Sequence, residues 1–331
     1  MKLIKKIIWC FSLLLTLIMF CVPAHAESLP RIVGGTEVSP AFKYTWMVGL
    51  INAGVSSDFD GHFCGGSLIS SDLVLTAAHC IVDDAGQVMN HTDIEVLVGA
   101  HDLNNPSENQ GIRERIRVSA ILKHENYDSA TTDNDIALLR LSKSVNTSLA
   151  PVRLIDNQSL AVTGSLAKAI GWGNTSSTDE EKFLPLLQEV DVPVVSQATC
   201  ASAMSSINNI TDNMLCAGYS QGGKDSCKGD SGGPLVIFDT DHWEQAGIVS
   251  WGAALCAQPD EYGVYTKVYN YLDWINANTV SGLADVIGIL KVLSGIPVSD
   301  PWKLSGYDVL KDGKTGSEDA IFFLQKIADM R

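Results

Sequence analysis

Short apolar runs separated by turn residues dominate the chain between Ile32 and about Thr279. Examples are Trp46–Ile51, Ser67–Leu75, Glu95–Val98, Ile136–Leu141 and Ala246–Trp251, with Gly, Asn, Asp, Ser or Pro clusters between them. Such runs are typical of β-strands, so the pattern predicts an all-β domain built as a sandwich or a barrel. Only Val268–Ala277 carries apolar residues on one helical face, and we expect it to form a helix that closes the domain.

The N-terminal end has the composition of a secretory signal. Residues 1–26 begin with Lys2, Lys5 and Lys6, continue as an apolar run and end at the small-residue site Ala24-His25-Ala26. An uncleaved membrane anchor is the alternative, because the apolar run is near the lower length limit for a spanning helix. The cleavage site favours removal, so we expect a secreted protein, extracellular or periplasmic, without a stable membrane anchor.

The net charge and the number of cysteines limit the possible partners and the cellular compartment of the protein. The formal net charge is −15 and the pI is about 4.7, which argues against nucleic acid and anionic membrane surfaces as partners. Removal of residues 1–26 leaves six cysteines, an even number that predicts three disulfides in an exported chain: Cys64, Cys80, Cys200, Cys216, Cys227 and Cys256. Counting alone leaves their connectivity open.

Three local patterns carry the chemistry. They are Leu75-Thr76-Ala77-Ala78-His79-Cys80, Asn134-Asp135-Ile136-Ala137-Leu138-Leu139 and Gly229-Asp230-Ser231-Gly232-Gly233-Pro234. A serine hydroxyl needs a base to become a nucleophile at neutral pH, and an imidazole can accept that proton and later return it. None of the other histidines lies in such a pattern, so we assign no catalytic role to them.

These patterns, in this order, resemble the chymotrypsin/trypsin family of serine peptidases, and the resemblance covers Ile32 to about Asn278. It implies two packed six-stranded antiparallel β-barrels with a C-terminal helix. It also implies that His79 is the general base, Asp135 orients it and Ser231 is the nucleophile. The N–H groups of Gly229 and Ser231 would form the oxyanion hole.

The resemblance further implies which cysteines pair: Cys64 with Cys80, Cys200 with Cys216, and Cys227 with Cys256. A further bridge that is common in relatives falls on Ala167 and Ile237, so both of its partners are missing here.

Substrate specificity follows from the same resemblance. Asp225 lies where the family has the floor of its primary pocket, and an acid there is typical of the trypsin-like branch. The remaining pocket residues would be Ser226, Ser250, Trp251, Gly252 and Gly263. A carboxylate at the floor of an open shaft predicts cleavage after Arg or Lys.

Arg31 and the following Ile32-Val33-Gly34-Gly35 resemble the activation junction of the family. Residues 27–31 would then be a short propeptide, and residues 32–279 the peptidase domain. Cleavage after Arg31 would free the amino group of Ile32 to pair with Asp230. The chain is therefore expected to be an inactive precursor that can process itself.

Residues 280–331 differ from the preceding domain in their apolar pattern, because apolar residues occur at helical spacing over Leu283–Leu293 and Ala320–Ile327. Their loop resembles a degenerate dockerin or EF-hand calcium loop, with acids at Asp308, Asp312 and Asp319. A plain helical appendage is the alternative, so calcium in this small helical module stays an open prediction.

No cofactor is required by this interpretation. The calcium loop of animal trypsins is not expected, because Ala100 stands at an acidic ligand position, and Tyr262 matches sodium-activated relatives or is simply a structural aromatic residue. Expected partners are protein or peptide substrates and protein inhibitors, with the enzyme acting as a monomer. A catalytically silent homologue that binds protein through the same groove is the competing class, and the intact His, Asp and Ser patterns argue against it.

Overall fold

The structure is a computed structural model that describes residues 32–83 and 86–279, together with residues 290, 291, 294, 317 and 321. The predicted signal peptide, the propeptide with Arg31, and the acids Asp308, Asp312 and Asp319 lie outside the described residues.

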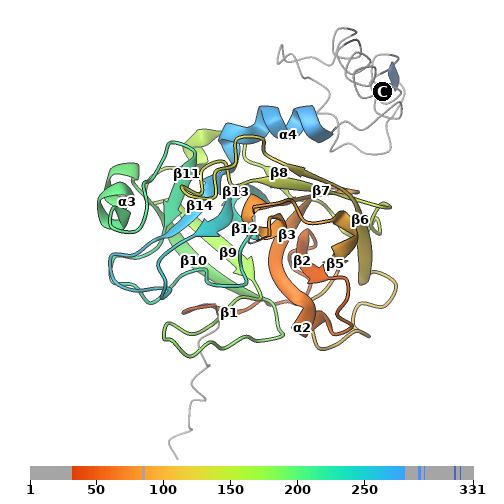
Figure 1. Cartoon of the computed structure of the whole chain (residues 1–331), viewed down its shortest axis with the longest axis horizontal. Helices are drawn as coiled ribbons and strands as arrows, with labels where there is room; N and C mark the ends of the chain where they lie inside the picture. The colour runs from red at the N-terminus through yellow and green to blue at the C-terminus, as the bar shows by residue number, and fades with distance from the viewer. Residues whose placement is uncertain are drawn as a thin grey trace, which may run out of the picture.

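The first half of the domain is a closed antiparallel barrel (Figure 1). Its strands, in the order β2-β3-β4-β7-β6-β5, are β2 (Met47–Asn52), β3 (His62–Ser70), β4 (Leu73–Thr76), β7 (Ala137–Leu141), β6 (Glu114–Lys123) and β5 (Ile94–Val98). The apolar run Ser67–Leu75 contains the end of β3 and most of β4. Ser70 Oγ donates to Oδ1 of Asp72 at 2.9 Å in the turn between them.

The second half is also a ring of six strands, because β10 and β12 both pair with β9. The ring consists of β9 (Leu166–Gly171), β10 (Gln188–Val195), β11 (Met214–Ala217), β14 (Gly263–Lys267), β13 (His242–Trp251) and β12 (Pro234–Asp239). Two short strands are added outside it, β1 (Thr36–Glu37) on β10 and β8 (Arg153–Leu154) parallel to β13. The predicted fold class is thus confirmed for the domain.

Helices are few and short in the described part of the chain. They are α2 (Asp58–Gly61), α3 (Gln197–Met204), α4 (Leu272–Thr279) and the 3₁₀ turns η1 (Ala78–Ile81), η2 (His91–Asp93), η3 (Gln158–Ala161) and η4 (Val268–Tyr271). The predicted closing helix is confirmed as η4 followed by α4. Helix α3 was not predicted, because its apolar residues form no helical stripe; its start is fixed by Ser196, whose Oγ accepts a hydrogen bond from Thr199 N.

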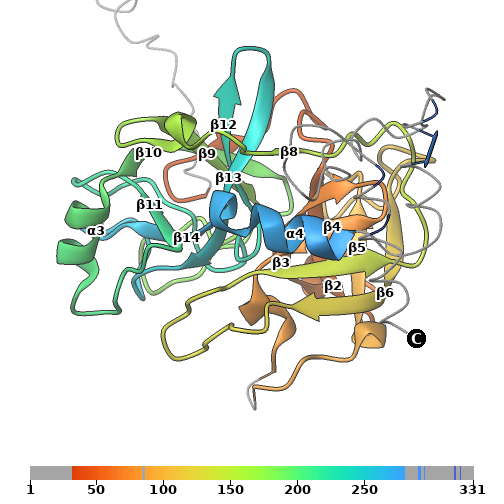
Figure 2. The ribbon, with the colours of Figure 1, turned by 90° about the horizontal axis from the view of Figure 1, so that it is seen from above.

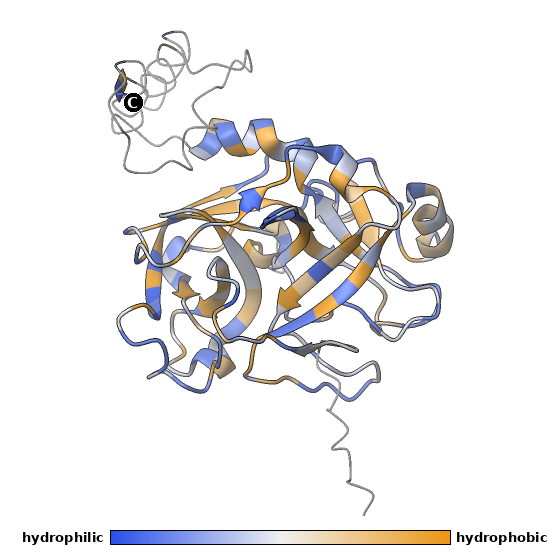
Figure 3. Ribbon diagram, turned by 180° about the vertical axis from the view of Figure 1, so that it is seen from behind, coloured by the Kyte–Doolittle hydropathy of each residue, from blue (hydrophilic) through white to orange (hydrophobic). Residues whose placement is uncertain are grey.

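Alternation of buried and half-buried residues builds the core. In β10, residues from Gln188 to Val195 alternate regularly between the two states, which places every second side chain inside the barrel. Figure 3 shows the corresponding alternation of apolar and polar residues along the strands. Ala167 and Ile237 face each other as register partners between β9 and β12, and both are buried.

The two barrels lie side by side (Figure 2), and hydrogen bonds join them. Gly65 N in β3 donates to the carbonyl oxygen of Ser231 at 2.7 Å. Nearby, Ser67 Oγ donates to Oε1 of the fully buried Gln245 at 2.5 Å. Because both bonds are sheltered from water, they hold the second barrel's loops in register with the first.

Candidate active site

His79 and Asp135 meet at the end of the first barrel. Strand β4 ends at Thr76, and the turn η1 that follows presents His79, while Asp135 lies just before β7. Nδ1 of His79 and Oδ2 of Asp135 are 2.7 Å apart, and His79 N donates to Oδ1 at 2.8 Å. Asp135 is fully buried, whereas the His79 side chain is 28% exposed. The carboxylate can only accept, so it keeps the proton on Nδ1 and leaves Nε2 as the basic nitrogen.

The second barrel also binds Asp135. Ser250 Oγ donates to Oδ2 at 2.5 Å, and Thr266 Oγ1 donates to the Asp135 carbonyl oxygen at 2.7 Å. Burial alone would raise the pKa of Asp135, but the charge and hydrogen bonds of His79 and the Ser250 hydroxyl outweigh burial and lower it. Burial alone would lower the pKa of His79, and the charge and hydrogen bond of Asp135 reverse this and raise it. The pair is thus arranged to stabilise an imidazolium.

Ser231 lies in a tight loop beside the turn that carries His79. Gly229 and Gly232 adopt φ values of 92° and 77°, which favour glycine. A Cβ on Gly232 would lie 2.2 Å from Thr76 Oγ1, so only glycine allows the serine loop to approach the end of β4 this closely. Within the described residues, no hydrogen bond joins Ser231 Oγ to His79; catalytic hydrogen bonds of this kind often form only when substrate binds.

The N–H groups of Gly229 and Ser231 are available for a ligand. Neither donates a hydrogen bond to any of the residues that the structure describes. Free N–H groups beside a nucleophile can stabilise a developing oxyanion.

Asp230 points away from this loop into the domain interior. It is fully buried, and its two carboxylate oxygens accept from Gly173 N at 2.8 Å and from Cys227 N at 2.9 Å. A Cβ on Gly173 would lie 2.5 Å from the carboxylate, so the cradle depends on glycine. Burial raises the pKa of Asp230 to about 7, against the effect of the two N–H donors. An unpaired carboxylate in this place is costly near neutral pH.

Because the pKa of Asp230 is raised, we expect the stability of the uncleaved precursor to depend on pH. A group whose folded pKa exceeds its unfolded value of 3.8 contributes stability that is complete below pH 3.8 and is lost as the pH rises through about 7. At about 1.4 kcal/mol per pKa unit, Asp230 should cost the uncleaved chain roughly 3 kcal/mol of unfolding free energy between pH 5 and pH 8. Urea unfolding of the Ser231→Ala precursor, with and without Asp230→Asn, measures this.

The loss should be smaller in the Asp230→Asn protein and unchanged by Asp156→Asn, which alters an exposed carboxylate. Burial lowers the pKa of His62 to about 4 and therefore adds an opposite trend, but that trend is common to all three proteins. Equal pH dependence with and without Asp230 would contradict the prediction.

The predicted pocket floor, Asp225, is also buried, with 5% of its surface exposed. Its Oδ2 accepts from Ala257 N at 3.1 Å, and among the described residues its Oδ1 has no hydrogen-bond partner. A Cβ on Gly263 would lie 2.7 Å from Oδ1, whereas one on Gly252 would meet nothing closer than 3.9 Å. Burial is the main cause that raises the pKa of Asp225 to about 7, and the charge of Asp230 adds to it.

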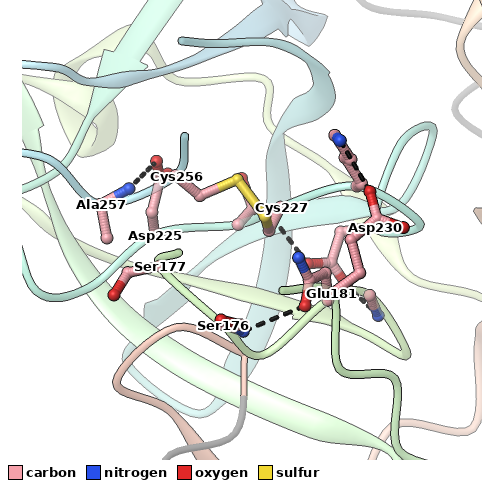
Figure 4. The surroundings of a disulfide bond; sticks show 12 residues. Ser176, Ser177, Glu181, Asp225, Cys227, Asp230, Cys256 and Ala257 are labelled. Atoms are coloured by element: carbon pink, nitrogen blue, oxygen red, sulfur yellow. Dashed lines mark hydrogen bonds and ion pairs between the residues drawn. A yellow bond between two sulfur atoms is a disulfide. The ribbon is translucent and has the colours of Figure 1, made fainter. Parts of the chain in front are cut away.

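The described residues form three disulfides, of which Cys64–Cys80 lies next to His79 and Cys227–Cys256 joins the serine loop to the loop of Ala257. They join Cys64 to Cys80, Cys200 to Cys216, and Cys227 to Cys256. Figure 4 shows the Cys227–Cys256 bridge with Asp225 and Asp230 on either side of it. Ser226, another predicted pocket residue, is next to Asp225 in the sequence, and its Oγ lies 3.0 Å from the hydroxyl of Tyr265.

Two contacts at this site had no signal in the sequence patterns. Lys228 Nζ lies 2.7 Å from Oε1 of Glu181, which comes from a loop distant in the sequence. Both side chains line a cavity of about 230 Å³ beside the Cys227–Cys256 bridge. The second contact is the Ser250 hydroxyl on Asp135: Ser250 was expected in the pocket wall, but not as a hydrogen-bond donor to the buried acid.

Residue types that bind metals also occur near this site, within the described part of the chain. One cluster of metal-binding residue types includes His79, but its other members, Cys64 and Cys80, are joined in a disulfide and offer no thiolate. Tyr262 is 4% exposed and packs against Cys200, Met204 and Val264, as a structural aromatic residue would.

Two closed barrels with a His–Asp pair, a serine loop and a buried acidic pocket along their seam are the architecture of a serine endopeptidase. Comparison with known proteins agrees: the profile of the Trypsin family matches residues 32–275. The chain is 42% identical over 252 residues to Trypsin-1 of Astacus astacus, covering 75% of this chain and all of that protein. It is 42% identical to Serine protease 1 of Rattus norvegicus over 80% of this chain and 96% of that protein, and 40% identical to Trypsin of Sus scrofa over 74% and 94%.

The chain therefore belongs to the Trypsin family, and it is a serine endopeptidase. Enzymes of this family act on proteins or peptides and generally need no cofactor. Among the described helices, none is both long enough and apolar enough to span a bilayer.

Proposed function

We propose that this enzyme hydrolyses peptide bonds through the triad His79, Asp135 and Ser231. Ser231 Oγ attacks the carbonyl carbon of the substrate while its proton passes to Nε2 of His79. The resulting imidazolium is stabilised by Asp135 and returns the proton to the amine as the C–N bond breaks. Water, activated by the same imidazole, then hydrolyses the acyl-enzyme. The N–H groups of Gly229 and Ser231 bind the oxyanion in both halves of the reaction.

The observation that carries this proposal is the 2.7 Å contact between His79 and a fully buried Asp135 that the second barrel also holds. A buried, ionised acid on Nδ1 holds the tautomer in which Nε2 can accept a proton and stabilises the imidazolium that results.

We further propose that the substrate residue before the cleaved bond is Arg or Lys. Asp225 presents one buried carboxylate oxygen without a hydrogen bond from any described residue, and a Cβ on Gly263 would lie 2.7 Å from that oxygen. Ser250, Trp251, Gly252 and Gly263 would form the walls of the shaft above it. A cationic side chain would supply the missing partner. Profiling the mature enzyme with a peptide library tests this, and preference for an apolar residue at that position would overturn it.

The precursor interpretation is part of the same proposal. Ile32 is completely buried at a φ of 38°, which is unfavourable for a β-branched residue, and Asp230 lacks a cationic partner among the described residues. A free amino group at Ile32 would supply that cation. Residues 1–26 would direct secretion, residues 27–31 would be the propeptide, and the mature enzyme would act as a monomer open to protein inhibitors.

Arg31→Gln should yield a secreted precursor that does not mature by itself, because cleavage at this junction requires the enzyme's own preference for a basic residue. N-terminal sequencing and peptide hydrolysis of the purified protein check this, with Arg31→Lys as the matched control that should still mature. Full activity of the Gln variant without a new N-terminus at Ile32 would contradict the activation proposal.

Deletion of residues 280–331 should leave hydrolysis of small peptides nearly unchanged, since the described site and both barrels lie within residues 32–279. The measurement is kcat and KM of the truncated and full-length mature enzymes on one peptide substrate. A large fall in kcat for a truncated enzyme with an unchanged Tm would assign the tail to the catalytic domain.

A further inference from the structure

The hairpin formed by β12 and β13 carries a second cluster of polar side chains away from the active site. Asp239 ends β12, and His242 and Glu244 lie near the start of β13. Asp239 and His242 are register partners, and Glu244 lies two residues further along the same strand. Side chains two residues apart and side chains of register partners share one face of a sheet, so all three project from the same face. Figure 2 shows that this hairpin projects from the barrel.

The atoms of this cluster converge. One ligand atom from each of the three side chains lies within 4.8 Å of the other two. Nε2 of His242 is 2.9 Å from Oε1 of Glu244. A tetrahedral Zn²⁺ with bonds of about 2.0–2.2 Å holds its ligand atoms roughly 3.4 Å apart, so small side-chain rotations bring the three into ligand positions.

The ring of His242 is held between two carboxylates. Nδ1 lies 2.8 Å from Oδ1 of Asp241 and Nε2 lies 2.9 Å from Oε1 of Glu244, so the metal-free ring donates from both nitrogens and a bound ion would replace the proton on Nε2. Metal-bound histidines usually have such a carboxylate on the other ring nitrogen, which sets the tautomer and increases the basicity of the ligand.

A buried acid gives an independent reason to place a ligand here. Glu244 is only 7% exposed, yet its Oε2 is fully buried and has no hydrogen-bond partner in the described part of the chain. An unsatisfied carboxylate oxygen costs free energy that a coordinated cation would recover.

We propose that Asp239, His242 and Glu244 bind a divalent transition-metal ion of the Zn²⁺ class, with water completing the coordination. One imidazole and two carboxylates are a ligand set typical of zinc, and the imidazole disfavours Ca²⁺ and Mg²⁺. The neighbouring cation Arg153 lies on β8 as the register partner of Glu244, and its charge acts on His242. It opposes metal binding and limits the affinity.

The ion would cross-link the two strands that support the catalytic loops. β12 starts three residues after Ser231, and β13 ends at Ser250 and Trp251. Because the cluster lies toward the opposite end of both strands, the ion should stabilise the hairpin without entering the reaction.

The test is calorimetric titration of chelator-treated, full-length enzyme with ZnCl₂. We expect saturable binding that weakens at least about tenfold in His242→Gln and in Asp239→Asn, and tightens in Arg153→Ala. His91→Gln removes another exposed histidine and should leave the Zn²⁺ affinity unchanged. Any Zn²⁺ bound by His79 would contribute equally to the titrations of all these variants. CaCl₂ in place of ZnCl₂ should give no saturable heat that depends on His242.

Two further measurements follow the ion in the wild-type protein directly. Zn²⁺ should raise the Tm of the wild type by several degrees and leave the Tm of His242→Gln unchanged, while peptide hydrolysis by the metal-free proteins should be equal. Co²⁺ should give visible absorption bands that are lost with His242→Gln. Zn²⁺ affinity and a Tm response that are the same in wild type, His242→Gln and Asp239→Asn would overturn the proposal.

Discussion

Ser231→Ala should lower kcat by about a millionfold on a peptide substrate. The substitution removes one hydroxyl and leaves the loop glycines, the disulfides and the His79–Asp135 contact in place. Without Oγ no acyl-enzyme can form, and only the oxyanion donors and substrate binding remain. Steady-state hydrolysis and a burst experiment on activated, purified protein measure the loss.

Folding and binding are the controls for this prediction. Ser231 is only partly buried, so its change to alanine should leave the Tm and the affinity for a substrate-like inhibitor nearly unchanged. Ser226→Ala is a useful comparison, since it removes a neighbouring buried hydroxyl that contacts Tyr265 and lies outside the triad. It should cost far less than Ser231→Ala. Activity of Ser231→Ala within tenfold of the wild type would exclude Ser231 as the nucleophile.

Local patterns predicted the strands well because the signals of a strand lie within a few residues. The run Glu95–Val98 falls inside β5, and Ile136–Leu141 contains all of β7, since apolar β-formers bounded by turn residues rarely have an alternative. The run Ser67–Leu75 was predicted as one strand but contains parts of two. Only two residues, Ser71 and Asp72, turn the chain between them, so the apolar pattern is hardly interrupted.

Contacts between distant segments could not be predicted in this way. Ser250 reaches Asp135 across 115 residues, and Lys228 reaches Glu181 between two loops. Neither bond has a local signature, because each depends on how the barrels pack. The same holds for Glu244: Trp243 and Gln245 beside it give no signal of a buried acid, and the pairing of β12, β13 and β8 buries its carboxylate beside His242.

The buried carboxylate of Asp225 connects structure to specificity most directly. Asp225 gains one hydrogen bond from Ala257 N, while its other oxygen faces the Gly263 backbone without a hydrogen-bond partner among the described residues. Burial raises its pKa to about 7, because the charged form is unfavourable away from water. A bound Arg or Lys side chain would pair with this charge and favour its ionised form.

Asp225→Ser should therefore lower kcat/KM on Arg substrates by roughly two to four orders of magnitude, because breaking one partner of a buried ion pair costs about 3–5 kcal/mol. Substrates with Phe or Ala at the same position should lose far less, since they never make the pair. The pH dependence should change as well: the Arg preference of the wild type should weaken as the pH falls through the titration of Asp225, and the variant should lack this component.

Kinetics with Arg, Lys, Phe and Ala substrates in wild type, Asp225→Ser and Lys228→Gln separate this role from a neighbouring one. Lys228 lies 2.7 Å from Glu181 at the cavity beside the pocket, so its loss should alter preferences at adjacent substrate positions and leave the preference for Arg intact. The Asp225 variant should behave in the opposite way. If the wild type prefers Phe, or if Asp225→Ser keeps an unchanged Arg preference, Asp225 does not form the floor of the pocket, and the source of specificity must lie in other residues of its wall.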